Sequence, residues 1–423
     1  MKKLLLILFC LPLITSAQQT YVPDDNFELE LISLGYDVLL DDSVLTANID
    51  AVTNLFLPFL SISDLTGIED FTALTSLSCS FNELTSLDVS ANTNLIGLWC
   101  EVNQITSLDV SNNTALTDLY CGFNQLTSLD VSVNTNLIKL GCAGNQLPSL
   151  DVGNNPALTT LDCNGNQLPS LDVSIHTALT TLSCNYNQLS NLNVSENISL
   201  TDLDCQENQL TSLDLSTNTA LTDLNCSDNQ LTSLDVNINT ALTTLDCQEN
   251  QLTSLDLSTN TALTHLYCSV NQLTSLDVSS ATALTDLNCL SNQLNSLDVS
   301  NNTVLTTLRS SSNQLTTLDV RNGNNMNIIT ISTNYNPSLT CIDVDDSSWS
   351  TNNWIIPMSG YFHFDDQHYF SNNCSGTSIE EHSSNKELLK IIDILGREVN
   401  HTTNQILFHL YDDGSVEKKF VVE

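Results

Sequence analysis

The sequence predicts a solenoid, in which coils of 21 residues stack along one axis and share a continuous hydrophobic core. Three observations support this fold class: a column of cysteines, a column of asparagines and a set of leucines, all repeating at the same interval. The eleven cysteines are Cys79, Cys100, Cys121, Cys142, Cys163, Cys184, Cys205, Cys226, Cys247, Cys268 and Cys289. The thirteen asparagines run from Asn82 through Asn313 to Asn334. A coil of this size cannot bury its leucines alone, so neighbouring coils must stack.

One unit, residues 116–136, reads LTDLYCGFNQLTSLDVSVNTN and indicates how each coil is built. Leu119 and Cys121 alternate at period two, which predicts a short strand with one buried face. Stacking in register would place equivalent strands about 4.8 Å apart in a parallel sheet. Asn124 follows where the chain must turn, and its amide suits backbone groups that no sheet pairs. The return half of each coil is short, so extended or 3₁₀ pieces are expected there and little helix.

Both ends of the solenoid need caps, because an open end exposes apolar core and sheet edge. Residues 18–51 predict a small helical N-terminal cap, with Asp24 as helix N-cap and Gly35 as the stop. Phe27, Leu31 and Leu34 fall on one face of that helix, which we expect to cover the first coil.

The repeats themselves are predicted over residues 52–344, with irregular units at each end. The first repeat has 22 residues, and its leucine pattern is shifted by one position. Ser310 and Ile331 stand where the last two full units would carry cysteine. Residues 345–375 are unusually rich in aromatic side chains, which predicts a closing C-terminal cap.

Charge and the N-terminus limit the classes of function. The chain has 49 acidic and 10 basic side chains, a formal net charge of −39, so nucleic acid is excluded as a direct ligand. Residues 1–17 combine two lysines, a short apolar run and small residues, which predicts a signal peptide. The apolar run is too short to span a bilayer, so we expect an exported protein without a transmembrane segment.

The repeat unit LxxLxCxxNQLTSLDVSxNTA resembles the bacterial leucine-rich repeat, in particular the 21-residue cysteine-containing type of internalin J-like surface proteins. The resemblance covers roughly residues 52–344. It implies a leucine-rich-repeat solenoid whose short strands line a concave face turned toward a partner. It also implies a monomeric, non-catalytic protein for adhesion or recognition, secreted or held at the outer cell surface.

The last segment, residues 376–423, changes character and predicts a small β unit of strands joined by a Gly turn and an Asp-Gly hairpin. It resembles a shortened C-terminal sorting domain of the Bacteroidetes type IX secretion system. The matching pieces are residues 393–399, residues 411–414 and Lys418-Lys419, while the usual N-terminal strands with their PNP-like turn are missing. The resemblance implies delivery to the cell surface.

Two residue columns could suggest chemistry but have simpler interpretations. In-register cysteines would have Cβ atoms near 4.8 Å apart, outside the disulfide range of roughly 3.5–4.5 Å, so they are predicted to be small buried hydrophobes. Cys341 and Cys374 lie outside that register and, in an exported protein, predict a disulfide. A column of eleven aspartates could bind Ca²⁺ or accept hydrogen bonds from nearby Ser, Thr and backbone groups. Asn193 in the twelfth place keeps the shape without the charge and favours hydrogen bonding, so no metal or cofactor is expected.

The residues that differ between coils indicate where recognition occurs. Two outward-facing columns begin aromatic or apolar and become acidic in the middle, where Asp202 and Asp223 lie beside them. The candidate ligand-binding residues are Phe81, Trp99, Val102, Tyr120 and Phe123, with Trp99 and Tyr120 stacked about 5 Å apart by strand spacing. The alternative is that these rings only cover the imperfect N-terminal coil.

Catalysis finds no support in the sequence. His363-x-Asp365-Asp366-x-His368 matches no standard metal spacing, and no nucleophile elbow, phosphate loop or HExxH motif occurs. The predicted function is therefore binding of another protein through the concave face. The alternatives are a glycan-binding module that uses Trp99 and Tyr120 as a platform, or a passive surface spacer.

Overall fold

The computed structural model describes residues 18–354, 361–374, 388–392, Arg397, Val399, 405–411 and 416–421. The chain divides after Asn372 into two compact units, each of which is described by itself. The predicted signal peptide, residues 1–17, lies outside the described residues. The predicted division into caps, repeats and sorting segment stays a prediction.

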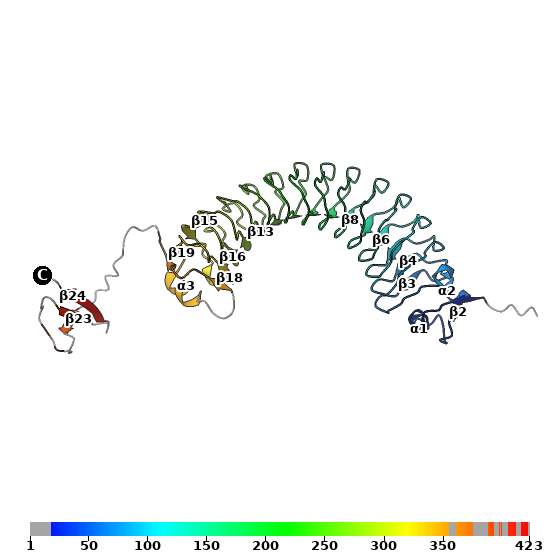
Figure 1. Ribbon diagram of the computed structural model, residues 1–423, viewed down its shortest axis with the longest axis horizontal. Helices are drawn as coiled ribbons and strands as arrows, with labels where there is room; N and C mark the ends of the chain where they lie inside the picture. Colours follow the sequence, from blue (N-terminus) through cyan, green and yellow to red (C-terminus); the bar gives the residue numbers. More distant parts are fainter. Residues whose placement is uncertain are drawn as a thin grey trace, which may run out of the picture. The chain divides into compact units, whose positions relative to one another are not determined.

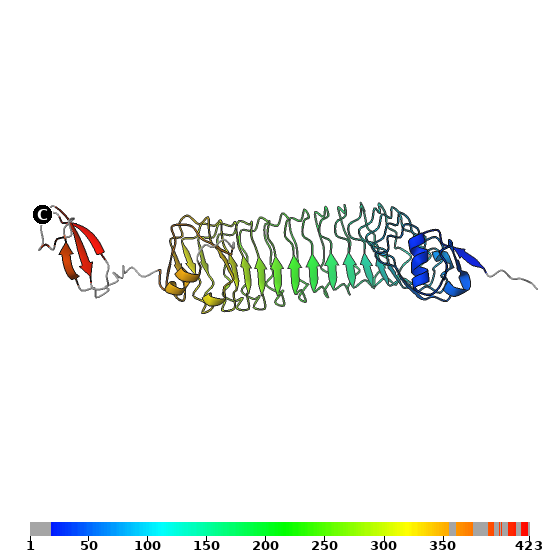
Figure 2. The same cartoon turned by 90° about the horizontal axis from the view of Figure 1, so that it is seen from below.

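The first unit is a solenoid, which confirms the predicted fold class. A sheet of 15 short strands lines the inner side of an arc of coils (Figure 1), and its strands lie side by side in one row (Figure 2). The strands are β3 (Asn54–Phe56), β4 (Ser76–Ser78), β5 (Gly97–Trp99), β6 (Asp118–Tyr120), β7 (Lys139–Gly141), β8 (Thr160–Asp162), β9 (Thr181–Ser183), β10 (Asp202–Asp204), β11 (Asp223–Asn225), β12 (Thr244–Asp246), β13 (His265–Tyr267), β14 (Asp286–Asn288), β16 (Thr307–Arg309), β18 (Thr330–Ser332) and β20 (Phe362–His363). All of them pair in parallel, and from β3 to β18 each is in register with its neighbours.

The central residue of each strand and the cysteine after it form the core. Leu119 and Cys121 have no exposed surface, and the equivalent residues of the other coils join them in one continuous cluster. The return half of most coils is a series of turns without helix, as its length predicts. Toward the C-terminal end a second parallel sheet forms there, from β15 (Ser296–Asp298), β17 (Thr317–Asp319), β19 (Cys341–Asp343) and β21 (Tyr369–Ser371).

Asparagine side chains join one coil to the next behind the strands. The Asn124 amide nitrogen donates to the carbonyls of Cys100 and Cys121, while its oxygen accepts the N–H of Ile105 in the preceding coil. The same pattern repeats from Asn82 to Asn313. Each buried turn therefore has its backbone groups satisfied by the side chain of the following coil.

The N-terminal cap contains α1 (Asp25–Ser33), α2 (Thr46–Ile49) and an antiparallel pair, β1 (Gln19–Tyr21) with β2 (Ser43–Leu45). Asp24 caps α1 as predicted, and its second oxygen accepts the N–H groups of Ser63 and Asp64, which fastens the helix to the solenoid. Phe27 and Leu31 are buried. The expectation for Leu34 was wrong: it is exposed, because the helix ends at Ser33 before that residue completes the buried face.

The register predicted for the last full unit was also wrong. Ile331 pairs with Leu308 and so occupies the leucine position, not the cysteine position. Asn336, not Asn334, bonds the carbonyl of Ser310 and the N–H of Leu315. This repeat is 23 residues long because it accommodates a 3₁₀ turn, η2 (Asn325–Asn327), which the cysteine spacing did not reveal.

The segment after the last repeat adds one more coil, with β20 and β21, and a helix, α3 (Ser347–Asn353). Trp354, Phe364 and Phe370 pack edge to face beside it, with ring centroids 5.2–6.3 Å apart. These rings supply a closing apolar layer of the kind that the aromatic density predicts.

The second unit contains a three-stranded antiparallel sheet, ordered β22 (Leu388–Ile392), β23 (Gln405–Tyr411) and β24 (Val416–Val421). The predicted Asp-Gly hairpin lies outside the described residues, but the two strands on either side of it pair as a hairpin requires. Among the described residues, no helix has the length and apolar character needed to cross a membrane.

Candidate functional site

The inner face of the arc presents the first and third residues of each strand, since the central residue points into the core. These flanking side chains are half-buried along most of the sheet. A partner on this face would therefore meet two parallel columns of side chains, whose identity changes from coil to coil.

Trp99 and Tyr120 form parallel rings near the N-terminal end of this face. Their centroids are 6.4 Å apart with an interplanar angle of 10°. A Cβ atom on Gly97 would clash with the Trp99 ring, and one on Gly141 would clash with the Tyr120 ring. The rings thus lie over glycine backbone on opposite sides, which explains why they are farther apart than the 5 Å strand spacing predicts.

A second aromatic column follows at the residue before each ladder asparagine. This residue has a left-handed backbone, with φ of 58° at Phe81 and 53° at both Val102 and Phe123. Phe123 lies over Gly144 of the next coil, where a Cβ atom would clash with its ring. The left-handed turn projects these side chains outward, so Phe81 is 46% exposed and Phe123 is 57% exposed.

Two further rings extend the cluster and were missed by the sequence analysis. Phe59 is stacked on Phe81 with centroids 4.3 Å apart, and Phe56 continues the strand column of Trp99. Both belong to the first, 22-residue repeat; counting back 22 positions from Ser78 and Phe81 would have found them. We call the seven residues Phe56, Phe59, Phe81, Trp99, Val102, Tyr120 and Phe123 the aromatic patch. Its exposure argues against the alternative that these rings only cover the first coil.

The middle of the same face forms a shallow groove of about 400 Å³ across β9 to β13. We call it the acidic groove, because Asp202, Asp204, Asp223 and Asp246 line it, together with Tyr267 at one end. Among the described residues, no ion pair reaches these four carboxylates.

Burial raises the pKa of the carboxyls in the third strand position. The pKa of Asp246 rises to about 6, mainly through burial and then through the charges of Asp228 and Asp204. The pKa of Asp204 and that of Asp162 also rise, with burial as the largest cause. The groove therefore holds carboxylates that lack a cationic partner and are poorly solvated, a state that a bound cation would relieve.

The exposed aspartate column outside this face has a different role. Asp130 accepts the N–H of Ser132, two residues on, at 2.9 Å, and Asn193 accepts the N–H of Ser195 in the same way. This hydrogen bond lowers the pKa of Asp130. Since an amide serves equally well in Asn193, hydrogen bonding accounts for the column without an ion.

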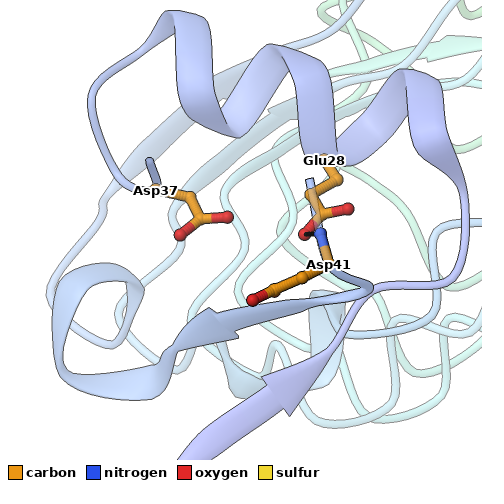
Figure 3. Close-up of side chains that lie close together, drawn as sticks. All are labelled: Glu28, Asp37 and Asp41. Atoms are coloured by element: carbon orange, nitrogen blue, oxygen red, sulfur yellow. Dashed lines mark hydrogen bonds between the residues drawn. The ribbon is translucent and has the colours of Figure 1, made fainter. Parts of the chain in front are cut away.

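Three carboxylates gather in the N-terminal cap, where the sequence analysis had singled out no site. Glu28, Asp37 and Asp41 each place an oxygen within 4.8 Å of the others (Figure 3). The fully buried Glu28 accepts the backbone N–H groups of Asp41, Asp42 and Ser43. These bonds give Glu28 a structural role, which is to hold the segment between α1 and β2.

The cysteines follow the simpler interpretation. All eleven ladder cysteines are free and buried, and burial raises their pKa, to about 12 for Cys79. Cys341 and Cys374 are both disulfide-bonded. Their pairing with each other remains our proposal.

The His363–His368 segment is structural as well. The Asp365 carboxylate accepts the N–H groups of Tyr335 and Asn336, and its carbonyl contacts Nδ1 of His368 at 2.5 Å. Asp365 thereby closes the last left-handed turn of the solenoid.

Comparison with known proteins agrees with this architecture. No family model matches the chain. Internalin J of Listeria monocytogenes serotype 4b is 40% identical over 79 residues, and this stretch covers 19% of the chain but only 8% of that protein. The solved functional domain of InlJ from Listeria monocytogenes, which includes a cysteine ladder, is 38% identical with a TM-score of 0.69, over 80% of each chain. The internalin InlF of the same species shares the fold, at 23% identity and a TM-score of 0.67, over 76% of this chain and 96% of that one.

Proposed function

Because the chain belongs to the internalin J-like leucine-rich-repeat proteins with a cysteine ladder, we propose that it is a non-catalytic recognition protein that binds another protein through its aromatic patch. The observation that carries this proposal is the arrangement of rings on the inner face. Trp99, Tyr120 and Phe123 lie over glycines, so their exposed faces form a pre-organised surface. Aromatic side chains of this kind dominate protein interfaces because they bury much area at little entropic cost.

The proposed test is capture of surface or secreted proteins by residues 18–423 immobilised on beads. A Trp99→Ala/Phe123→Ala variant should lose at least tenfold in affinity for the captured partner. Tyr186→Ala is the matched control, since Tyr186 is also an exposed ring on a left-handed turn but lies outside the patch. Equal capture by all three proteins would contradict the proposal.

A glycan ligand is the second candidate, and the parallel rings of Trp99 and Tyr120 favour it. Sugars bind flat aromatic surfaces through their apolar faces. A glycan array probed with the same three proteins separates the two functions. Binding of one glycan that depends on Trp99, without protein capture, would favour this candidate. A passive spacer would bind neither class of ligand.

For delivery, we propose export through the signal peptide of residues 1–17 and surface placement through the type IX-like segment of residues 376–423. The three antiparallel strands of the second unit support a separate small β unit. In a bacterium with type IX secretion, the full chain should be accessible to external protease. A form ending at residue 375 should remain in the periplasm. External accessibility of the truncated form would remove the sorting role.

A further inference from the structure

The aromatic patch and the acidic groove lie on the same face, in adjoining parts of one sheet. The patch ends at β6 with Tyr120, and the first carboxylates of the groove are on β10. Four strand spacings separate them, which is about 19 Å. Both regions belong to the rigid first unit, so this distance is fixed by the number of coils between them.

The surface between the two regions is low. Gly141 and Gly144 follow the patch, and Gly165 stands in the next coil at the same left-handed position as Gly144. Tyr120 and Phe123 lean over the first two of these glycines, toward the groove. A chain that left the patch could therefore pass over backbone to the groove without meeting a large side chain in the left-handed column.

Charge selects what could occupy this path. Lys139 and Arg309 are the basic residues of the inner strands, and each is already paired with an aspartate, Asp118 or Asp286. Glu207, Asp228 and Glu249 add three more acidic groups on the left-handed turns beside the groove. The potential along the path is therefore negative, which repels anionic ligands and attracts cationic ones.

We propose that the partner presents an extended segment with one large apolar side chain and, about six residues along, two or more Lys or Arg side chains. The apolar side chain docks on the aromatic patch and the cations enter the acidic groove. Six residues follow from the 19 Å separation and a rise of about 3.3 Å per extended residue. This inference rests on the proposed function, since it names the chemistry of the partner that the patch receives.

A basic peptide fits this face better than a neutral glycan or an apolar surface. A sugar could use the Trp99 and Tyr120 rings, but it would leave the half-buried carboxylates of Asp204 and Asp246 without a cation. A guanidinium or ammonium group would form charge-assisted hydrogen bonds there. Two contact regions also give specificity in spacing, which a single apolar patch cannot supply.

The probe is a fluorescein-labelled peptide with one Trp, a five-residue Gly/Ser spacer and Arg-Arg, measured by fluorescence anisotropy against residues 18–423. It should bind at least tenfold more tightly than the same peptide with Ala-Ala or Glu-Glu in place of Arg-Arg. A two-residue spacer should lose most of this gain. Affinity that is independent of both Arg-Arg and spacer length would overturn the inference.

Variants of the protein test the groove directly. Asp204→Asn/Asp246→Asn should weaken the Arg-Arg peptide at least tenfold and leave the Ala-Ala peptide unchanged. The fold tolerates asparagine there, because Asn225 and Asn288 occupy the same strand position and accept the same local N–H bond. Asp130→Asn/Asp214→Asn is the matched control, removing two charges from the outer column, where Asn193 already replaces aspartate.

The outcomes separate the two proposals. Equal losses in the groove and control variants would reduce the effect to net charge and contradict the inference. Trp99-dependent binding that ignores Arg-Arg would overturn the inference alone. Partner capture that ignores Trp99 and Phe123 would overturn the proposed function.

Discussion

Single residues on the left-handed turns carry backbone strain that is repeated along the molecule. Val102 and Val270 are β-branched, yet each has φ of 53°, a region that glycine adopts freely and valine avoids. Gly144 and Gly165 show that glycine fits the same turn. The turn persists in every coil because the ladder asparagine that follows it fixes the backbone by hydrogen bonds to three carbonyl groups.

Val270→Gly should therefore stabilise the protein. Relief of strain outweighs the added entropy of the unfolded chain, so we expect about 1 kcal/mol more stability in urea denaturation. Val270 is exposed, so little burial is lost. Val304→Gly is the control: Val304 is equally exposed but has no left-handed backbone, and its replacement should destabilise. Destabilisation by Val270→Gly would show that the turn is not strained.

The carboxyl of Asp246 should make stability depend on pH. Its pKa is raised to about 6, so between its ordinary value and pH 6 the folded state holds the proton more tightly than the unfolded chain. The stabilisation is present at low pH and is lost as the pH rises through 6. Asp246→Asn should raise the unfolding free energy at pH 7 by about 1 kcal/mol, after allowance for solvent screening, and have little effect at pH 4.

Asp130→Asn provides the opposite sign. The pKa of Asp130 is lowered by hydrogen bonds from Ser132, so its contribution is present at neutral pH and is lost as the pH falls through its folded pKa. A pH series of thermal melts on both variants measures the two signs. A loss of stability at pH 7 in Asp246→Asn would contradict the role given to burial.

At the scale of the element, each coil contributes one cysteine, and the exception shows why. Ser310 continues the cysteine column and is fully buried, but its hydroxyl has no hydrogen-bond partner among the described residues. A buried hydroxyl without a partner is less favourable than a thiol of the same shape.

Ser310→Cys should stabilise the protein by about 1–2 kcal/mol, since it removes an unsatisfied hydroxyl and extends the thiol column. Ser311→Ala is the control, because the Ser311 hydroxyl bonds Ser332 and Asn334 and its loss should destabilise. Thermal melts of the two variants decide the matter. A neutral or unfavourable Ser310→Cys would mean that water or local movement satisfies the hydroxyl.

The coil was predictable from sequence wherever one side chain does one job at a fixed interval. Leu119, Cys121 and Asn124 all occupy the positions that their spacing predicts. The 23-residue coil was not predictable, because Asn334 and Asn336 both fit an asparagine column and only pairing of β18 with β16 chooses between them. A left-handed turn leaves little sequence signal when aromatic, acidic and β-branched residues all occupy it.

A second buried asparagine column on the return side also escaped the sequence analysis. Asn113 donates to the carbonyls of Val89 and Asn92, and the pattern continues with His176 in one coil and Ala281 in another. These replacements hid the column. In the candidate site, Trp99 and Tyr120 were found by their column, whereas Phe56 and Phe59 were missed because their repeat is one residue longer.

For the whole molecule, the cysteines predict one redox-stable state in an oxidising environment. The eleven ladder thiols are buried and their pKa is raised, so the native protein should not react with Ellman's reagent. All eleven should react together once denaturant opens the solenoid. Mass mapping of the non-reduced protein should find one bridge, Cys341 to Cys374. A bridge between two ladder cysteines would contradict this assignment.

The constant length of the coil has a consequence for how binding specificity could change. Removing or duplicating one whole 21-residue coil between β6 and β10 would let every asparagine bond re-form with a new neighbour. The aromatic patch and the acidic groove would each stay intact, while the gap between them changed by one strand spacing, about 4.8 Å. The solenoid is in this sense a ruler with fixed gradations. Recombination within the repeats could retune the length of the segment it measures, in whole steps and without redesigning either contact.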